Sequence, residues 1–125
     1  MSKTLPEKLL LKPGGSLLLV HPPLGYADRL GSLPEGAEVV PAGPADVVQF
    51  FCPDQAGLAG HVDEALAALV PNGVLWCCYP KQSAKVATDL TRDRGWEGLT
   101  RRGWQVVSAI SVDDVWSGLR FMPAR

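Results

Sequence analysis

A wholly apolar run of six residues, Val74 to Tyr79, most constrains the fold of this chain. A short continuous apolar run of this kind is typical of a strand that is covered on both faces. A helical pattern and the stop signal Pro71-Asn72-Gly73 precede it, and a polar loop with Lys81 and Lys85 follows it. This order predicts an α/β sheet with a cationic loop at the carboxyl end of a buried strand, where open sheets bind ligands.

The rest of the chain alternates strands and helices in the same way. The expected strands cover residues 16–20, 37–40, 46–52, 74–79, 104–112 and 116–122. The expected helices begin at Thr4, Tyr26, Asp54 and either Asp89 or Thr91, and the last one reaches about residue 102. In the helix after Asp54 the apolar residues at helical spacing are Leu58, Val62, Leu66, Leu69 and Val70, and Asn72-Gly73 ends that helix.

Two short links constrain how the strands pair. Asp113 to Val115 is so short a link that the last two strands form an antiparallel hairpin. Residues 41–45 are also few, whereas a parallel crossover normally needs about a dozen residues or more. Residues 37–40 therefore form either a very short strand or one that is not a parallel neighbour, and the sequence leaves both open.

Composition narrows the functional classes. The chain has 125 residues, a net charge of -1 and 20% charged residues, which predicts one domain over residues 1–125 and no nucleic-acid partner. The longest uncharged run, residues 65–80, is too short to cross a membrane, and the chain begins without a signal-peptide pattern. We therefore expect a cytoplasmic protein with no membrane partner.

The spacing of the cysteines and histidines in the sequence does not match that of a metal-binding motif. Cys52, Cys77 and Cys78 all lie in apolar runs, so we expect free cysteines in the core. Cys77 and Cys78 are adjacent on one strand and must point to opposite faces. We predict no metal site, and we expect His61 on the surface of its helix.

Four segments resemble the Rossmann-like class I methyltransferases. They are residues 16–20 (SLLLV) leading into a loop, residues 45–48 (ADVV), residues 69–75 (LVPNGVL) and the final hairpin. Residues 79–83 (YPKQS), 87–91 (ATDLT) and 115–121 (VWSGLRF) resemble more closely an uncharacterised bacterial family of short methyltransferase-like proteins, a domain of unknown function. The resemblance implies one three-layer α/β domain with a truncated, mostly parallel sheet of about six strands. The last strand would insert beside the fourth, and one strand-helix unit would be missing.

The segments that hold the methyltransferase cofactor depart from the family pattern. Its glycine-rich first loop corresponds here to Leu19 to Gly25, which keeps only Gly25 and contains two prolines without backbone N–H donors. The acidic residue that would bind the ribose hydroxyls is missing, because the chain reads Val40-Pro41 at that point. We therefore expect that the protein has no cofactor, and that it does not bind S-adenosylmethionine.

The resemblance also brings the end of the fourth strand and the hairpin turn to one edge of the sheet. The candidate ligand-binding residues there are Tyr79, Lys81, Ser83, Lys85, Asp114, Trp116 and His21. Residues 80–102 carry six basic and three acidic side chains, net +3, which suits a phosphate or carboxylate near the two lysines. The alternatives are a solvated helix face, a structural pair of Lys81 with Asp114, and Trp116 as hairpin packing.

Three functional hypotheses follow. The first is a non-catalytic or vestigial methyltransferase-like domain that binds a small anionic ligand or a protein partner at the carboxyl edge of its sheet. The second is a small enzyme at the same edge, with an atypical S-adenosylmethionine-dependent methyltransferase as one form. The third is a subunit that forms a homodimer or complex through apolar surface left by the missing strand. No catalytic residue can be named from the sequence.

Overall fold

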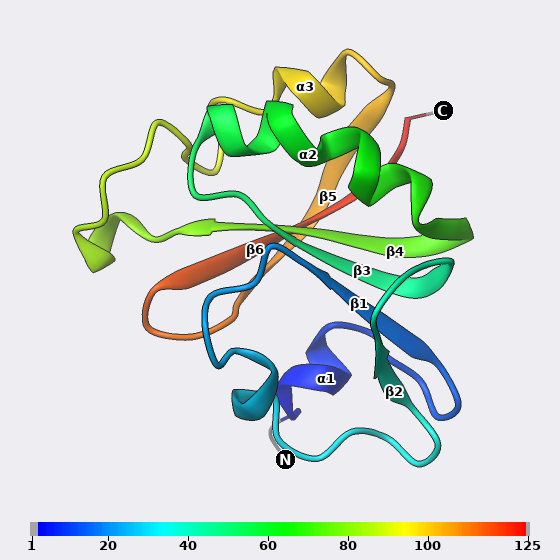
Figure 1. The fold of residues 1–125 in the computed structure, drawn as a ribbon. Helices are drawn as coiled ribbons and strands as arrows, with labels where there is room; N and C mark the ends of the chain where they lie inside the picture. The colour runs from blue at the N-terminus through cyan, green and yellow to red at the C-terminus, as the bar shows by residue number, and fades with distance from the viewer. Residues whose placement is uncertain (1–2, 125) are drawn as a thin grey trace.

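The protein, described over residues 3–124 by a computed structural model, is built on one six-stranded sheet (Figure 1). Its strands are β1 (Ser16–Val20), β2 (Glu38–Val40), β3 (Ala45–Phe51), β4 (Leu69–Pro80), β5 (Trp104–Ser111) and β6 (Trp116–Pro123). They lie in the order β2-β1-β3-β4-β6-β5. The first four strands are parallel, and β6 runs antiparallel to both β4 and β5. The predicted hairpin, with its last strand beside the fourth, is confirmed.

Helices cover both faces of this sheet, which gives the predicted three layers. The helices α2 (Gln55–Ala67) and α3 (Glu97–Thr100) lie on one face, and α1 (Leu5–Lys8) lies on the other (Figure 1). The 3-10 turn η1 (Ala27–Arg29) leads into Leu30, which is buried in the same apolar cluster as Leu9 after α1. Cys77 belongs to the core on the α2 side and Cys78 to the core on the α1 side. All three cysteines are buried and free, as predicted.

The open question about residues 37–40 is answered by the register of β2. This strand is parallel to β1 and very short, and its last residue, Val40, lies level with Leu18. Strand β3, on the other side of β1, pairs its Val47 with Leu17. Between the end of β2 and the start of β3, the chain therefore returns by only a few residues along the strand direction. It also crosses two strand spacings, about 10 Å. The residues between Val40 and Ala45 can span that distance without a helix.

The predicted end of the helix before β4 is wrong. Helix α2 ends at Ala67, and Leu69 and Val70 belong to β4 although they continue the helical spacing. Leu69 pairs with Ala45, whereas Val74 pairs with Val47, so the strand bulges between these two pairs. Pro71-Asn72-Gly73 forms this bulge and does not stop the helix.

The predicted helix from Asp89 or Thr91 to about residue 102 is also wrong. Only Glu97–Thr100 is helical, and the preceding segment folds back so that Thr91 and Arg94 form a β-bridge. Gly95 has a φ of +99°, which an α-helix does not contain. The segment is held by buried Leu90 and Trp96, and the Trp96 indole N–H donates to the Thr91 carbonyl at 2.7 Å.

Helix α1 closes the α1 side of the sheet. Thr4 and Glu7 form the predicted capping box, with the Glu7 carboxylate accepting from the Thr4 N–H at 3.0 Å. The Trp76 indole on β4 donates to the carbonyl of Leu9 at 2.9 Å. This bond ties the amino-terminal segment to the middle of the sheet. Among residues 3–124, no helix is long and apolar enough to cross a membrane.

Candidate functional site

The carboxyl end of β4 and the start of β6 border an open hollow of about 590 Å³, here called the β4–β6 hollow. Its lining combines an aromatic residue, two cations, one carboxylate, a side-chain amide and three hydroxyls. The lining residues are Tyr79, Lys81, Gln82, Ser83, Thr91, Arg92, Asp93 and Ser117. Three of the predicted site residues, Tyr79, Lys81 and Ser83, therefore share one hollow.

Strand pairing brings these residues together. Tyr79 on β4 pairs with Ser117 on β6, and Pro80 pairs with Trp116. The Lys81 N–H continues this pairing by donating to the Val115 carbonyl at 2.7 Å. The short turn η2 (Gln82–Ala84) follows at once and places Ser83 on the rim.

The opposite wall is the folded-back segment before α3. Thr91, Arg92 and Asp93 line the hollow, and Trp96 supports them through its bond to the Thr91 carbonyl. The Trp96 ring meets the Tyr79 ring edge to face at 5.6 Å. Both rings are largely buried, so the wall rests on a packed aromatic base.

The electrostatics of the hollow favour an anion. Lys81 is half-buried and donates to the Ser111 hydroxyl on β5 at 2.7 Å, so one of its three donors is fixed and two are free for a ligand. Burial raises the pKa of the Tyr79 phenol. A hydrogen bond with Ser117 and the positive charge of Arg92 lower this pKa, but by less. Tyr79 is therefore neutral near pH 7 and can donate a hydrogen bond.

The other predicted residues lie outside this hollow. Lys85 is exposed beyond η2, and Asp114 is exposed in the hairpin turn. It is Asp113 whose carboxylate orders that turn, by accepting from the N–H groups of Val115 and Trp116 at 2.8 Å each. The Trp116 ring packs edge to face on Phe51 at 5.1 Å, in the apolar cluster on the α1 side.

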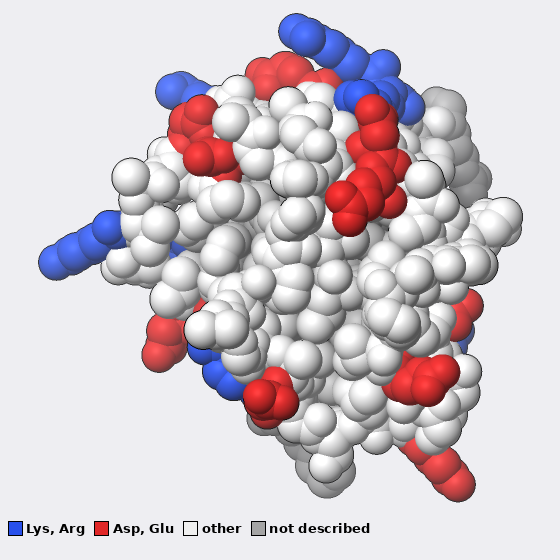
Figure 2. Space-filling model, in the orientation of Figure 1, with Lys and Arg blue, Asp and Glu red and all other residues white. Residues whose placement is uncertain are grey.

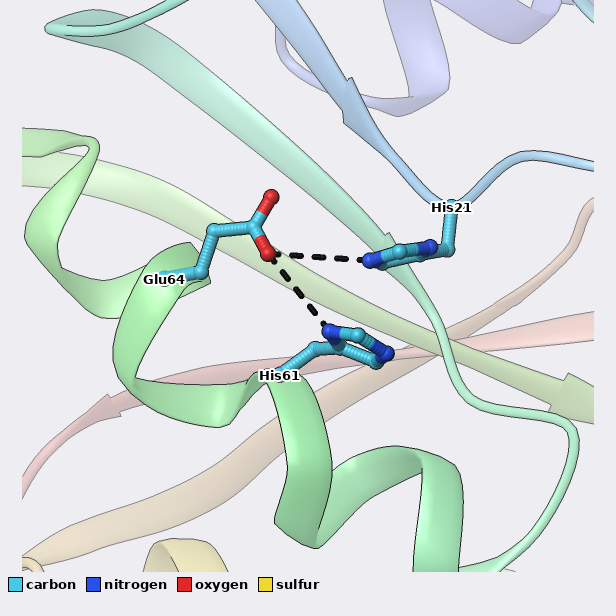
Figure 3. Close-up of side chains that lie close together, drawn as sticks. All are labelled: His21, His61 and Glu64. Atoms are coloured by element: carbon cyan, nitrogen blue, oxygen red, sulfur yellow. Dashed lines mark ion pairs between the residues drawn. The ribbon is translucent and has the colours of Figure 1, made fainter.

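His21 lies in a different place, between the end of β1 and helix α2. It has a left-handed φ of 54°, and its ring stacks on His61 with centroids 3.6 Å apart. The Glu64 carboxylate, one turn further along α2, lies against both rings (Figure 3). This cluster was not predicted from the sequence. The one signal was the spacing of His61 and Glu64, which puts them on the same face of a helix.

The loop after β1 does not fit S-adenosylmethionine. Pro22 and Pro23 offer no N–H groups, and His21, which precedes them, points its imidazole at α2 (Figure 3). Strand β2 ends at Val40 and continues into Pro41, so neither residue can bind ribose hydroxyls through a carboxylate. These two segments therefore lack the backbone donors and the carboxylate that the family uses for this cofactor.

Comparison with known proteins identifies the fold. No protein-family model matches the sequence, and no curated protein is similar to it in sequence. Solved structures do match. The ribosomal protein L11 methylase of Lactobacillus delbrueckii subsp. bulgaricus superposes with a TM-score of 0.59 at 10% identity, over 97% of this chain and 76% of that one.

Two further structures agree with it. A DhpI–SAH complex gives a TM-score of 0.57 at 15% identity, over 96% of this chain and 80% of that one. The Bacillus subtilis M1A22 tRNA methyltransferase TrmK gives 0.54 at 12% identity, over 100% of this chain and 67% of that one. The chain has a Rossmann-like fold similar to that of these methyltransferase structures. Identities this low establish the fold and leave the activity to be argued from the site.

Proposed function

We propose that this protein is a methyltransferase-like binding domain without methyltransferase activity, and that it binds a small anionic ligand in the β4–β6 hollow. The observation that supports this most is the convergence of Lys81 and Arg92 with the hydroxyls of Ser83, Thr91 and Ser117 around one hollow. Cations with several neutral donors suit phosphate or carboxylate oxygens. The hollow also lies at the carboxyl end of β4, the edge at which open α/β sheets bind ligands.

The absence of turnover is proposed from the chemistry of the hollow and the loop after β1. Asp93 is the carboxylate in the lining, and it is exposed to solvent. A tyrosine phenol is protonated near neutral pH, and burial raises the pKa of Tyr79 further, so this side chain is a hydrogen-bond donor there and not a base. The prolines after β1 remove the backbone donors that would hold the usual methyl donor.

The experiment is a calorimetric titration with inorganic phosphate, sulfate, citrate and adenosine monophosphate. The tightest of these probes is then measured with Lys81→Ala, Arg92→Ala and the matched control Lys85→Ala. A charge-assisted hydrogen bond contributes about 1.5 to 3 kcal/mol, so each of the first two variants should bind about 10- to 100-fold more weakly. Lys85 lies outside the lining, and its variant should bind within about twofold of wild type, as exposed charges contribute little.

No binding of any probe, or equal losses in all three variants, would contradict the proposed site. A second candidate, an atypical S-adenosylmethionine-dependent methyltransferase, is favoured by the fold alone. Titration with S-adenosylmethionine and S-adenosylhomocysteine discriminates between the two. No heat with either compound at high ligand concentration would end the methyltransferase candidate, whereas robust turnover of any substrate would refute the non-catalytic proposal.

A further inference from the structure

His21, His61 and Glu64 form a cluster that the anion proposal does not use. His21 comes directly after β1, whereas His61 and Glu64 lie one turn apart on α2 (Figure 3). The face of the molecule drawn in Figure 2 has few acidic or basic side chains in its middle, and most of those visible lie toward its edges. These two are the only histidines of the chain, so the fold brings both imidazoles to one carboxylate.

The geometry of the cluster is close to that of a zinc site. The Glu64 Oε1 atom lies 3.6 Å from His21 Nε2 and 3.5 Å from His61 Nδ1. Zinc bonds to histidine nitrogen and carboxylate oxygen are about 2.0 to 2.2 Å long, so neighbouring ligand atoms in a tetrahedral site are about 3.3 to 3.6 Å apart. All three ligand atoms lie within 4.8 Å of one another. The two imidazole rings lie 3.6 Å apart between centroids, so they must turn away from one another before both nitrogens face one ion.

The cluster also joins nitrogen and oxygen ligand atoms from two separate elements. His21 Nε2, after β1, and His61 Nδ1, on α2, both face the same carboxylate oxygen of Glu64. A divalent cation at this point would bind the carboxylate and one lone pair of each imidazole, which are ligand atoms that zinc prefers.

We infer that His21, His61 and Glu64 bind a Zn²⁺ ion. Two histidines and one carboxylate are a ligand set that zinc prefers, and three protein ligands leave a fourth position open for water or another ligand. Each of the three side chains is about half exposed, with 47%, 42% and 59% of its surface accessible, so an ion can enter from solvent. The inference stands independently of the β4–β6 hollow, because the two sites share no residue.

The test is a titration of tag-free protein, stripped with a chelator, with ZnCl₂ by calorimetry and with Co²⁺ by visible absorption. We expect one ion per chain and the intense absorption bands of tetrahedral Co²⁺. His61→Ala and His21→Ala should each weaken Zn²⁺ binding at least about 100-fold, because even outer-shell partners of ligands contribute about 10- to 100-fold in affinity. Glu64→Gln should weaken it at least about tenfold.

Asp63→Asn is the matched control, because it removes the same negative charge from the residue that precedes Glu64 on α2. Asp63 points to Arg102 at 3.1 Å and is outside the cluster, so its variant should bind Zn²⁺ within about twofold of wild type. Absence of saturable binding, or binding kept in His61→Ala, would overturn the inference. If a variant fails to fold, wild-type NMR decides: Zn²⁺ must shift the imidazole signals of both histidines, and unchanged signals refute the site.

Discussion

Replacing Gly95 by alanine tests the packing that holds one wall of the β4–β6 hollow. Gly95 has a φ of +99°, and a Cβ atom there would lie 2.6 Å from Leu90 Cδ2 and 3.0 Å from Gln55 Nε2. Neither neighbour can move freely. Leu90 is fully buried, and Gln55 donates through Nε2 to the Asp89 carbonyl at 3.0 Å.

The expected cost has two parts. A non-glycine residue in the positive-φ region loses about 1 to 3 kcal/mol. Overpacking a tight site adds about 1 to 3 kcal/mol. We therefore expect Gly95→Ala to lower the free energy of unfolding by about 2 to 6 kcal/mol, a large part of the about 5 to 15 kcal/mol typical of a domain. The segment with Thr91 and Arg92 should loosen, and anion binding should weaken with it.

The assay is urea unfolding followed by tryptophan fluorescence, with Gly98→Ala as the matched control. Gly98 lies in α3, and a Cβ atom there would meet Leu58 at 3.7 Å, an ordinary contact. This variant should stabilise the protein by about 0.5 to 1 kcal/mol through reduced entropy of the unfolded chain. A free energy of unfolding for Gly95→Ala within about 0.5 kcal/mol of the wild-type value would refute the reasoning, because ordinary surface substitutions have effects of that size.

Three further predictions concern the same fold. Burial raises the pKa values of Cys78 and Tyr26, so the unfolded chain loses protons that the folded state keeps, at Cys78 above about pH 8.5 and at Tyr26 above about pH 10. The free energy of unfolding, measured with urea under reducing conditions, should fall by up to about 1.4 kcal/mol per pH unit and group, and a flat profile to pH 10.5 would contradict this. Trp76→Phe leaves the Leu9 carbonyl without its donor and opens a small cavity, which should cost about 2 to 4 kcal/mol in the same assay. Asp46→Ala removes the acceptor of the Ser16 N–H and hydroxyl at 2.9 and 3.1 Å and should cost about 1 kcal/mol, with Asp46→Asn closer to wild type; equal losses in both would contradict this.

Local patterns predicted the sheet where the chain is strongly apolar or tightly connected. Residues 16–20 form β1 as expected, and the link after Ser111 forces the hairpin. The end of α2 could not be predicted, because Leu69 and Val70 continue its helical spacing. Only their neighbour β3 shows that they belong to a strand. Tertiary pairing overrides local periodicity in such cases.

Only the part of the candidate site that follows from the order of the strands was predicted. Tyr79 and Lys81 could be placed because they end a buried strand. Arg92 could not, since the positive φ of Gly95 and the fold-back before α3 leave no clear pattern in the sequence. The contact of His21 with α2 depends on how that helix crosses the sheet, which residue spacing does not encode.

The most direct test of the central claim is an NMR titration of ¹⁵N-labelled protein with inorganic phosphate. The account predicts saturable shifts at the amides around the β4–β6 hollow, namely Ser83, Thr91, Asp93 and Ser117. It predicts no comparable shift at Lys85 beyond the rim. Shifts centred elsewhere in the protein, or no saturable shift with phosphate or the other anions named above, would contradict the claim that this hollow binds a small anion.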